Sequence, residues 1–500
     1  MKILLKGFVA DGRHEPSRMA VLAADGVIAA VEREIIGSCA ADRTAVFKDE
    51  IIAPGFIDVH GHSDMSLPAS PAAYSKRTQG VTGEITGNCG LSVFPVSDLN
   101  REHLEALYAN YGLSISWDDL EGYRRFLAEK AVALRTFPLC GHNTLRASVA
   151  GYETETLSGD MLNAMENALD AALRSGAPGL STGLLYTPGC FADRDEIVAL
   201  MKVLRRHDAV YVTHLRSEGD RLLESLTGTL EAAEEAGLRK VEISHLKTAG
   251  RDNWGKLDEV MRVIARYRDR GIDVRFDRYP YTESQTMLSV ILPPPFDRMS
   301  DRKITEKLKD ERVFDDLLRR VSAYDRERWS RWRLTGTTHP VWRRFIGKRY
   351  SELPGDPAQA VLEQLAHDAD TATVGGMSMS EENMRRIILD DLCMPGSDGN
   401  ALPADGTFGS THPRAFGAIA NFVRMKLDAG LSVGRTVWSV SAAPAEFFRL
   451  SGVGEIRCGN RADITVFSPD EIGSSADFAS PCRPAEGIRM TMLDGEASYL

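Results

Sequence analysis

Two histidines separated by one residue are the first feature of this sequence that could do chemistry. They follow a mostly apolar run at 51–59, within the segment Ala53-Pro54-Gly55-Phe56-Ile57-Asp58-Val59-His60-Gly61-His62. Alternate side chains of a β-strand share a face, so His60 and His62 should point together from the carboxyl end of a strand. Two imidazoles that converge at the mouth of a parallel sheet are well placed to hold a metal ion.

Further residues of metal-ligand type stand at the ends of other predicted strands. They are Cys89 in Gly87-Asn88-Cys89-Gly90, His214 in Thr213-His214-Leu215-Arg216, His245 in Ser244-His245-Leu246-Lys247, and Asp398 in Gly396-Ser397-Asp398-Gly399. Taken singly, such a residue could be a buried thiol, a core histidine or an aspartate that caps a helix. The coincidence at five strand ends favours a site for a divalent transition metal, which prefers these ligand types.

The ligand types indicate a reaction. A metal held by one thiolate and two imidazoles keeps an open position for water and lowers the pKa of that water toward neutrality. Asp398, facing the metal, can take the proton from the water and return it to a leaving amine, as a general base and then a general acid. The pattern predicts amide hydrolysis without a covalent enzyme intermediate. A serine or cysteine nucleophile is disfavoured because no nucleophile-elbow pattern is present and Cys89 is better used as a ligand.

The elements that must position these residues alternate apolar runs with helical patterns, which indicates β/α units and a parallel sheet. Strands are predicted at 51–59, 81–86, 134–140, 179–182, 210–214, 240–245, 272–277 and 392–397, and helices between them include 195–207, 222–236 and 257–270. Eight such units predict an α/β fold, a (β/α)8 TIM-like barrel whose chemistry lies at the carboxyl ends of its strands. The run at 372–376 is compatible with a further strand.

Short β-like runs at both ends of the chain enclose this middle. Strands are predicted at 2–9, 19–23, 27–31, 463–467 and 488–493, with turns at Asp25-Gly26 and Asp494-Gly495. We predict a small β-sandwich domain built from 1–52 and 450–500 and a metal-dependent hydrolase barrel at 53–449. The long gap before the last barrel strand predicts a helical insertion over the mouth, at about 285–390.

Composition limits the class of protein. The chain has 500 residues, 43% of them hydrophobic, as in a large soluble domain with an appendage. The net charge of −11 argues against nucleic-acid binding, and no apolar run approaches the roughly 18 residues needed to span a bilayer. Seven scattered cysteines and an amino end unlike a signal peptide predict a reducing cytoplasm.

Together these motifs resemble a known family. The run from Pro54 to His62 with the distal Gly-Ser-Asp-Gly is similar to the amidohydrolase superfamily. The Asn-Cys-Gly turn, the two later histidine motifs, Tyr279-Pro280-Tyr281 and His412-Pro413-Arg414 resemble the N-acyl-D-amino-acid deacylases, or D-aminoacylases, over almost the whole chain. The resemblance implies zinc-dependent hydrolysis of the amide bond of N-acyl-D-amino acids, which releases a carboxylate and a free D-amino acid.

The resemblance also implies roles for the residues around the metal. One tightly bound zinc is expected on Cys89, His214 and His245. His60 and His62 are expected to form a weaker or vacant second metal position. Asp398 is expected to be the catalytic acid and base. Many amidohydrolases bridge two metals with a carboxylated lysine, and Cys89 stands in that part of the site here.

Substrate recognition is expected at the barrel mouth. Lys247, Tyr281 and Arg414 match family motifs and are expected to bind the carboxylate of a small N-acyl-D-amino acid. Relatives that prefer acidic D-amino acids use an additional arginine after the Tyr-Pro-Tyr segment, and 282–296 holds no basic residue here. This departure implies a neutral or apolar side chain, while Arg298 just beyond keeps an acidic one open.

Two other interpretations remain open at this point. A cyclic-amide hydrolase, such as a hydantoinase or dihydroorotase, shares the fold and the His-x-His pair, but it would use a bridging lysine, and the Cys89 turn speaks against it. A catalytically silent scaffold that kept the fold to bind a partner should have lost metal ligands or the aspartate. All six of these residues are present in the sequence.

Overall fold

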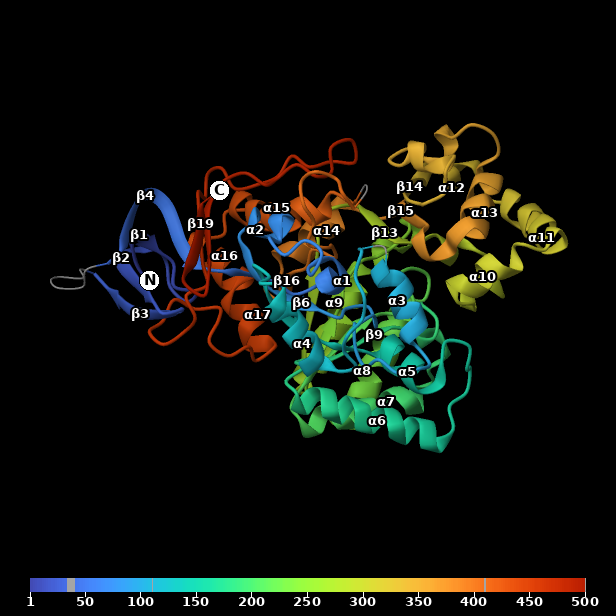
Figure 1. Ribbon diagram of the computed structural model, residues 1–500, viewed down its shortest axis with the longest axis horizontal. Coiled ribbons are helices and arrows are strands. Elements are labelled where there is room, and N and C mark those ends of the chain that lie inside the picture. Colours follow the sequence, from blue (N-terminus) through green and yellow to red (C-terminus); the bar gives the residue numbers. More distant parts are fainter. Residues whose placement is uncertain (34–40, 110, 409–410, 500) are drawn as a thin grey trace.

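The structure of the protein is a computed structural model, and it describes residues 1–33, 41–109, 111–408 and 411–499. Figure 1 shows a sheet built from both termini at one end of the long axis and a lobe formed by the late insertion at the other. The barrel strands and their helices lie between them. Among the described residues, no helix is both long enough and apolar enough to cross a membrane. Cys39 lies outside the described residues.

Strands from both ends of the chain form one seven-stranded sheet in the order β19-β18-β17-β4-β1-β2-β3. Its strands are β1 (Lys2–Val9), β2 (Ser17–Ala24), β3 (Val27–Glu32), β4 (Arg43–Pro54), β17 (Ile464–Phe467), β18 (Ile488–Leu493) and β19 (Glu496–Tyr499). β4 joins the two ends of the chain, because it pairs in parallel with β1 and antiparallel with β17. Both predicted turns have positive φ at their two central residues, which is the hairpin geometry that Asp-Gly favours.

Parallel strands form the predicted barrel. They are β5 (Phe56–Asp58), β6 (Val81–Thr86), β7 (Arg135–Pro138), β8 (Cys140–Gly141), β9 (Gly179–Gly183), β10 (Val210–His214), β11 (Lys240–Ile243), β12 (Asp273–Arg278) and β16 (Cys393–Pro395). β7 and β8 share the third of eight positions, because β7 pairs with β6 and β8 pairs with β9. The ring closes between β5 and β16, where the Val59 N–H donates to the Pro395 carbonyl at 2.9 Å.

The apolar run at 51–59, predicted as one strand, is divided between two sheets. β4 ends at Pro54 in the terminal sheet, and β5 begins at Phe56 in the barrel. Gly55 lies between them, and a Cβ at this position would meet Thr82 Oγ1 at 1.8 Å. The chain crosses between the sheets without a polar turn because both sides of the crossing are buried. Hydrophobicity alone therefore did not reveal the boundary.

Helices surround the barrel. They are α1 (Ser63–Ser66), α2 (Tyr74–Arg77), α3 (Arg101–Ala109), α4 (Leu120–Glu129), α5 (His142–Ala150), α6 (Gly159–Arg174), α7 (Arg194–Arg206), α8 (Leu222–Ala236), α9 (Leu257–Asp269), α14 (Glu381–Leu389), α15 (Arg414–Asp428), α16 (Val433–Val440) and α17 (Ala442–Phe447). The three helices predicted by name are observed within one residue at each end. α8, for example, ends at Ala236 and is capped by Gly237, whose left-handed φ of 67° suits a glycine.

The late insertion is less helical than predicted. It contains β13 (Glu283–Met287), α10 (Asp301–Lys307), α11 (Glu311–Ser322), α12 (Arg326–Arg331), β14 (Trp332–Gly336), α13 (Pro357–Asp368) and β15 (Thr373–Met377). β13, β15 and β14 form a separate antiparallel sheet, so the run at 372–376 is not a barrel strand. α14, inside the range predicted for the insertion, packs against β12 and β16 of the barrel.

Candidate metal centre

Cys89 lies at the centre of the predicted ligands, at the carboxyl ends of the barrel strands. Its Sγ is 3.4 Å from His60 Nε2, 3.7 Å from His214 Nδ1 and 3.5 Å from His245 Nε2. In tetrahedral zinc sites, Zn–S distances of about 2.3 Å and Zn–N distances of about 2.0–2.1 Å place sulfur and nitrogen about 3.6 Å apart. The arrangement of this thiol and these imidazoles therefore fits a zinc ion.

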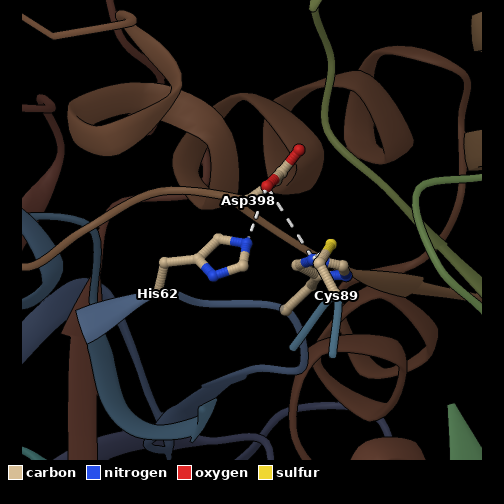
Figure 2. Close-up of side chains that lie close together, drawn as sticks. His62, Cys89 and Asp398 are labelled. Atoms are coloured by element: carbon tan, nitrogen blue, oxygen red, sulfur yellow. Dashed lines mark hydrogen bonds and ion pairs between the residues drawn. The ribbon is translucent and has the colours of Figure 1, made fainter. Parts of the chain in front are cut away.

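The potential ligands form two groups that share Cys89. One group is Cys89, His214 and His245, and the other is His60, His62, Cys89 and Asp398. Figure 2 shows the Asp398 carboxylate facing His62 and Cys89, with Asp398 Oδ1 3.1 Å from His62 Nε2. The same oxygen lies 3.8 Å from His60 Nε2. The barrel thus brings together all six residues that the sequence placed around a metal.

The backbone at this site is unusual. Cys89, His245 and Asp398 have positive φ values of 53°, 37° and 50°, although none of them is glycine. Left-handed backbone at such residues costs of order 1–3 kcal/mol each and persists only where the surrounding structure holds it. Three such residues in one cluster indicate that the barrel fixes these side chains against a local preference.

Two carboxylates, one of them fully buried, orient the imidazoles. Asp277 Oδ2 lies 2.9 Å from His60 Nδ1, and Glu218 Oε1 lies 2.9 Å from His245 Nδ1. Each contacts the ring nitrogen opposite the one that faces Cys89, an arrangement that fixes the tautomer and raises the basicity of a ligand. Sequence reasoning missed both residues. Their positions could have indicated this role, because Asp277 ends a predicted strand and Glu218 follows His214 by four residues.

The charges of the cluster favour an ionised thiolate and an ionised carboxylate. Burial alone would raise the pKa of Cys89, but His60 and His245 hold it well below its usual value. Burial would likewise raise the pKa of Asp398, but Arg414 and His62 hold it well below its usual value. A thiolate is the form that binds metal, and an ionised Asp398 can accept a proton.

Two of the three predicted substrate-binding residues reach this cluster. Lys247 Nζ lies 2.6 Å from Glu218 Oε1 and 2.9 Å from His245 Nδ1. Arg414 Nη1 lies 2.7 Å from Asp398 Oδ2. Both side chains are buried cations at the barrel mouth. The third residue, Tyr281, points elsewhere: its ring packs on His412, and its hydroxyl accepts a hydrogen bond from Asn421 of α15.

Tyr279, the other tyrosine of the same motif, lies among these cations. Its ring is 4.9 Å from the Arg414 guanidinium carbon, and its buried hydroxyl has no hydrogen-bond partner in the described part of the chain. Burial would raise the pKa of Tyr279, but Lys247, Arg278 and Arg414 lower it below its usual value. An unpartnered buried hydroxyl among cations points to a polar, anionic ligand.

The chain is similar to known deacylases in both sequence and structure. No protein-family model matches the chain. The chain is 31% identical to the N-acyl-D-glutamate deacylase of Alcaligenes xylosoxydans xylosoxydans over 503 residues, covering 99% of this chain and 92% of the relative. The N-acyl-D-glutamate deacylase of Bordetella bronchiseptica, complexed with zinc and a phosphonate mimic of the tetrahedral intermediate, matches with a TM-score of 0.82 and 27% identity, over 99% and 96% of the two chains.

A solved D-aminoacylase is similar to nearly the same extent. It has a TM-score of 0.80 and 28% identity, over 99% of this chain and 97% of that one. Its binuclear metal centre is described as having one-metal activation and second-metal attenuation.

Proposed function

The chain belongs to the N-acyl-D-amino-acid deacylase family of the amidohydrolase superfamily, and on that premise we propose how its own residues act. The protein is a metal-dependent amidohydrolase that hydrolyses N-acyl-D-amino acids to a carboxylate and a free D-amino acid. One observation supports the residue assignments above all others: Cys89 Sγ lies within 3.7 Å of nitrogens from three histidines. Asp398 lies beside the same cluster.

We assign the tightly bound zinc to Cys89, His214 and His245. We assign a second, weaker position to His60 and His62, which share Cys89 and have Asp398 beside them. A bound zinc supplies Lewis acidity toward the substrate carbonyl and lowers the pKa of the attacking water. Because a second metal would engage Asp398, excess zinc should lower activity, in line with the second-metal attenuation described for the D-aminoacylase.

Asp398 then moves the proton. Its ionised carboxylate accepts a proton from the water that attacks the amide carbon, and it delivers that proton to the amide nitrogen as the C–N bond breaks. The amine therefore leaves as a neutral group. The ion pair with Arg414 keeps Asp398 ionised before the substrate arrives.

The substrate carboxylate binds to Lys247, Arg414 and Tyr279 in this proposal. The first two supply charge, and the unpartnered hydroxyl of the third supplies a hydrogen bond. Tyr279 replaces Tyr281 in this role because the Tyr281 hydroxyl faces Asn421. The carboxylate requirement distinguishes this activity from that of a hydantoinase acting on a ring without a carboxylate, such as dihydrouracil.

For the substrate side chain, the absence of a basic residue at 282–296 supports a neutral or apolar D-amino acid. Arg298 is exposed and stacks over Phe191.

A second candidate, an acidic substrate side chain, is favoured by Arg278. This buried guanidinium lies 4.2 Å from the Tyr279 ring centroid and forms no ion pair within the described residues. A second substrate carboxylate would compensate such a charge.

A panel of N-acetyl-D- and N-acetyl-L-amino acids, followed by chiral analysis of the products, tests this function. Leucine, methionine, aspartate and glutamate derivatives cover the two side-chain candidates, and dihydrouracil tests the cyclic-amide alternative. We expect release of D-amino acids only. Hydrolysis of dihydrouracil in preference to every linear substrate would disprove the assignment.

We also propose a cytoplasmic location, which is supported by six described cysteines, all of them unpaired.

A further inference from the structure

A buried lysine lies beneath the candidate metal centre and touches none of its metal-ligand side chains. Lys76 of α2 is fully buried, and its Nζ donates to Asp58 Oδ2 at 2.7 Å, to Ser397 Oγ at 2.8 Å and to the Gly399 carbonyl at 2.9 Å. These three bonds use all three protons of an ammonium group. Lys76 is therefore a charged structural donor, unlike a carboxylated lysine that bridges metals.

The partners of Lys76 lie on both sides of the barrel closure. Asp58 is the last residue of β5, two residues before His60, and its Oδ1 accepts hydrogen bonds from the backbone N–H groups of His60, at 3.1 Å, and Ser397, at 2.9 Å. Ser397 and Gly399 directly flank Asp398. Lys76 thus links the strand that carries the histidine pair to the turn that carries the carboxylate.

This turn needs such support. Asp398 has a φ of 50°, a left-handed conformation that is unfavourable for a residue with a side chain. Its own N–H donates to the His60 carbonyl at 2.7 Å, and Ser397 Oγ accepts from the Gly399 N–H at 3.1 Å. Every one of these bonds ends on a residue that Lys76 or Asp58 also contacts.

Close packing leaves the linkage no room to shift. Glu84 Oε1 lies 3.5 Å from Lys76 Nζ, and its side chain fills the space above Gly61, where a Cβ would meet this oxygen at 1.6 Å. Gly61 separates the two histidines of the pair. The buried ammonium and its carboxylates therefore pack directly against the backbone that spaces His60 and His62.

We propose that Lys76 is a positioning residue that holds Asp398 at its working distance from His60 and His62. The inference rests on the proposed function, in which Asp398 moves the proton. Lys76 acts on the reaction only through Asp398 and on metal binding only through the second position. The zinc on Cys89, His214 and His245 should not depend on it.

The test compares Lys76→Met with Lys426→Met. Lys426 is also a buried lysine, but it lies on α15 twelve residues beyond Arg414, about 18 Å along the helix. We expect Lys76→Met to lower kcat about 100-fold, because misplacement by about 1 Å can cost that much, while KM stays near the wild-type value. Lys426→Met should keep the wild-type kcat.

A double variant separates positioning from general damage. Lys76→Met combined with Asp398→Asn should be no slower than Asp398→Asn alone, since the carboxylate that Lys76 positions is already gone. A further tenfold loss in the double variant would overturn the inference. If Lys76→Met does not fold, Ser397→Ala keeps the Lys76–Asp58 pair, and it should lower kcat several-fold for the same reason.

A zinc titration of metal-free protein gives a readout that needs no activity. In Lys76→Met the first equivalent of zinc should bind as in the wild type, and the second should bind at least tenfold more weakly. Wild-type affinity for the second equivalent together with wild-type kcat would refute the role of Lys76. A wild-type protein without deacylase activity would instead contradict the proposed function, and the titration would still decide the positioning role.

Discussion

Replacement of Cys89 by alanine should remove most of the zinc. Cys89 Sγ is the one donor shared by both potential ligand groups, so its loss affects both metal positions. Zinc sites with four protein ligands have apparent binding free energies of about 10–16 kcal/mol, or about 2.5–4 kcal/mol per ligand. At about 1.4 kcal/mol per tenfold change, loss of one ligand weakens binding by about 10²–10³-fold.

The charge of the thiolate adds to this effect. Cys89 is one of the groups that raise the pKa of both His60 and His245, so its removal takes away the negative charge that lies between the imidazoles. The assay is competition for zinc with a chelator of known affinity, with metal content measured after dialysis. Cys393→Ala is the matched control, because Cys393 is buried in β16 and belongs to neither ligand group. Wild-type zinc affinity in Cys89→Ala would refute the assignment.

Three further variants test other parts of the site and fold. Asp398→Asn should retain one zinc and lose about 10³-fold in kcat, because asparagine cannot accept the proton. Near-native kcat in this variant would refute the mechanism. Loss of the zinc would instead identify Asp398 as a metal ligand. Arg414→Met should lower kcat/KM about 100-fold for N-acyl-D-amino acids but not for the matching amides, and equal losses would argue against a carboxylate contact. Glu196→Gln should destabilise the fold by about 3 kcal/mol in urea unfolding at pH 7, since it leaves Arg146 buried without a counter-charge. Burial alone would raise the pKa of Glu196, but His142 and Arg146 bring it below the usual 4.5. The wild type is therefore more stable than the variant above pH 4.5, and this difference in unfolding free energy disappears as the pH falls through the lower folded-state pKa. A stability difference that persisted at low pH would contradict this account.

Much of the fold and of the metal centre could be predicted from local sequence. β6, β10 and α8 are observed at their predicted residues, because hydrophobic periodicity and turn residues act over a few positions. The convergence of His60 and His62 was predicted from strand alternation, although β5 ends at Asp58 and both histidines lie just beyond it. The barrel then required only that the strand ends meet, and so all six residues of the candidate metal centre could be listed before any contact was known.

The insertion shows the limit of periodicity. The alternating run at 372–376 is β15, but it pairs with β13 and β14 outside the barrel. A strand pattern is the same whichever sheet accepts it, so the choice of partner depends on contacts distant in sequence. For the same reason the run at 51–59 did not reveal that its halves belong to different sheets.

The fine structure of the site was decided by tertiary contacts. Sequence identified the Tyr-Pro-Tyr motif and chose Tyr281. Both tyrosines have the same chemistry, and only the positions of Asn421 and Arg414 led us to propose Tyr279 instead. Asp277 orients His60 across 217 residues, and Lys76 reaches Ser397 across 321. The sequence determined which residues stand at the strand ends, because the ends of a strand depend on residues a few positions away. Their orientation, protonation and spacing depend on buried partners that only the closed barrel brings within hydrogen-bond distance.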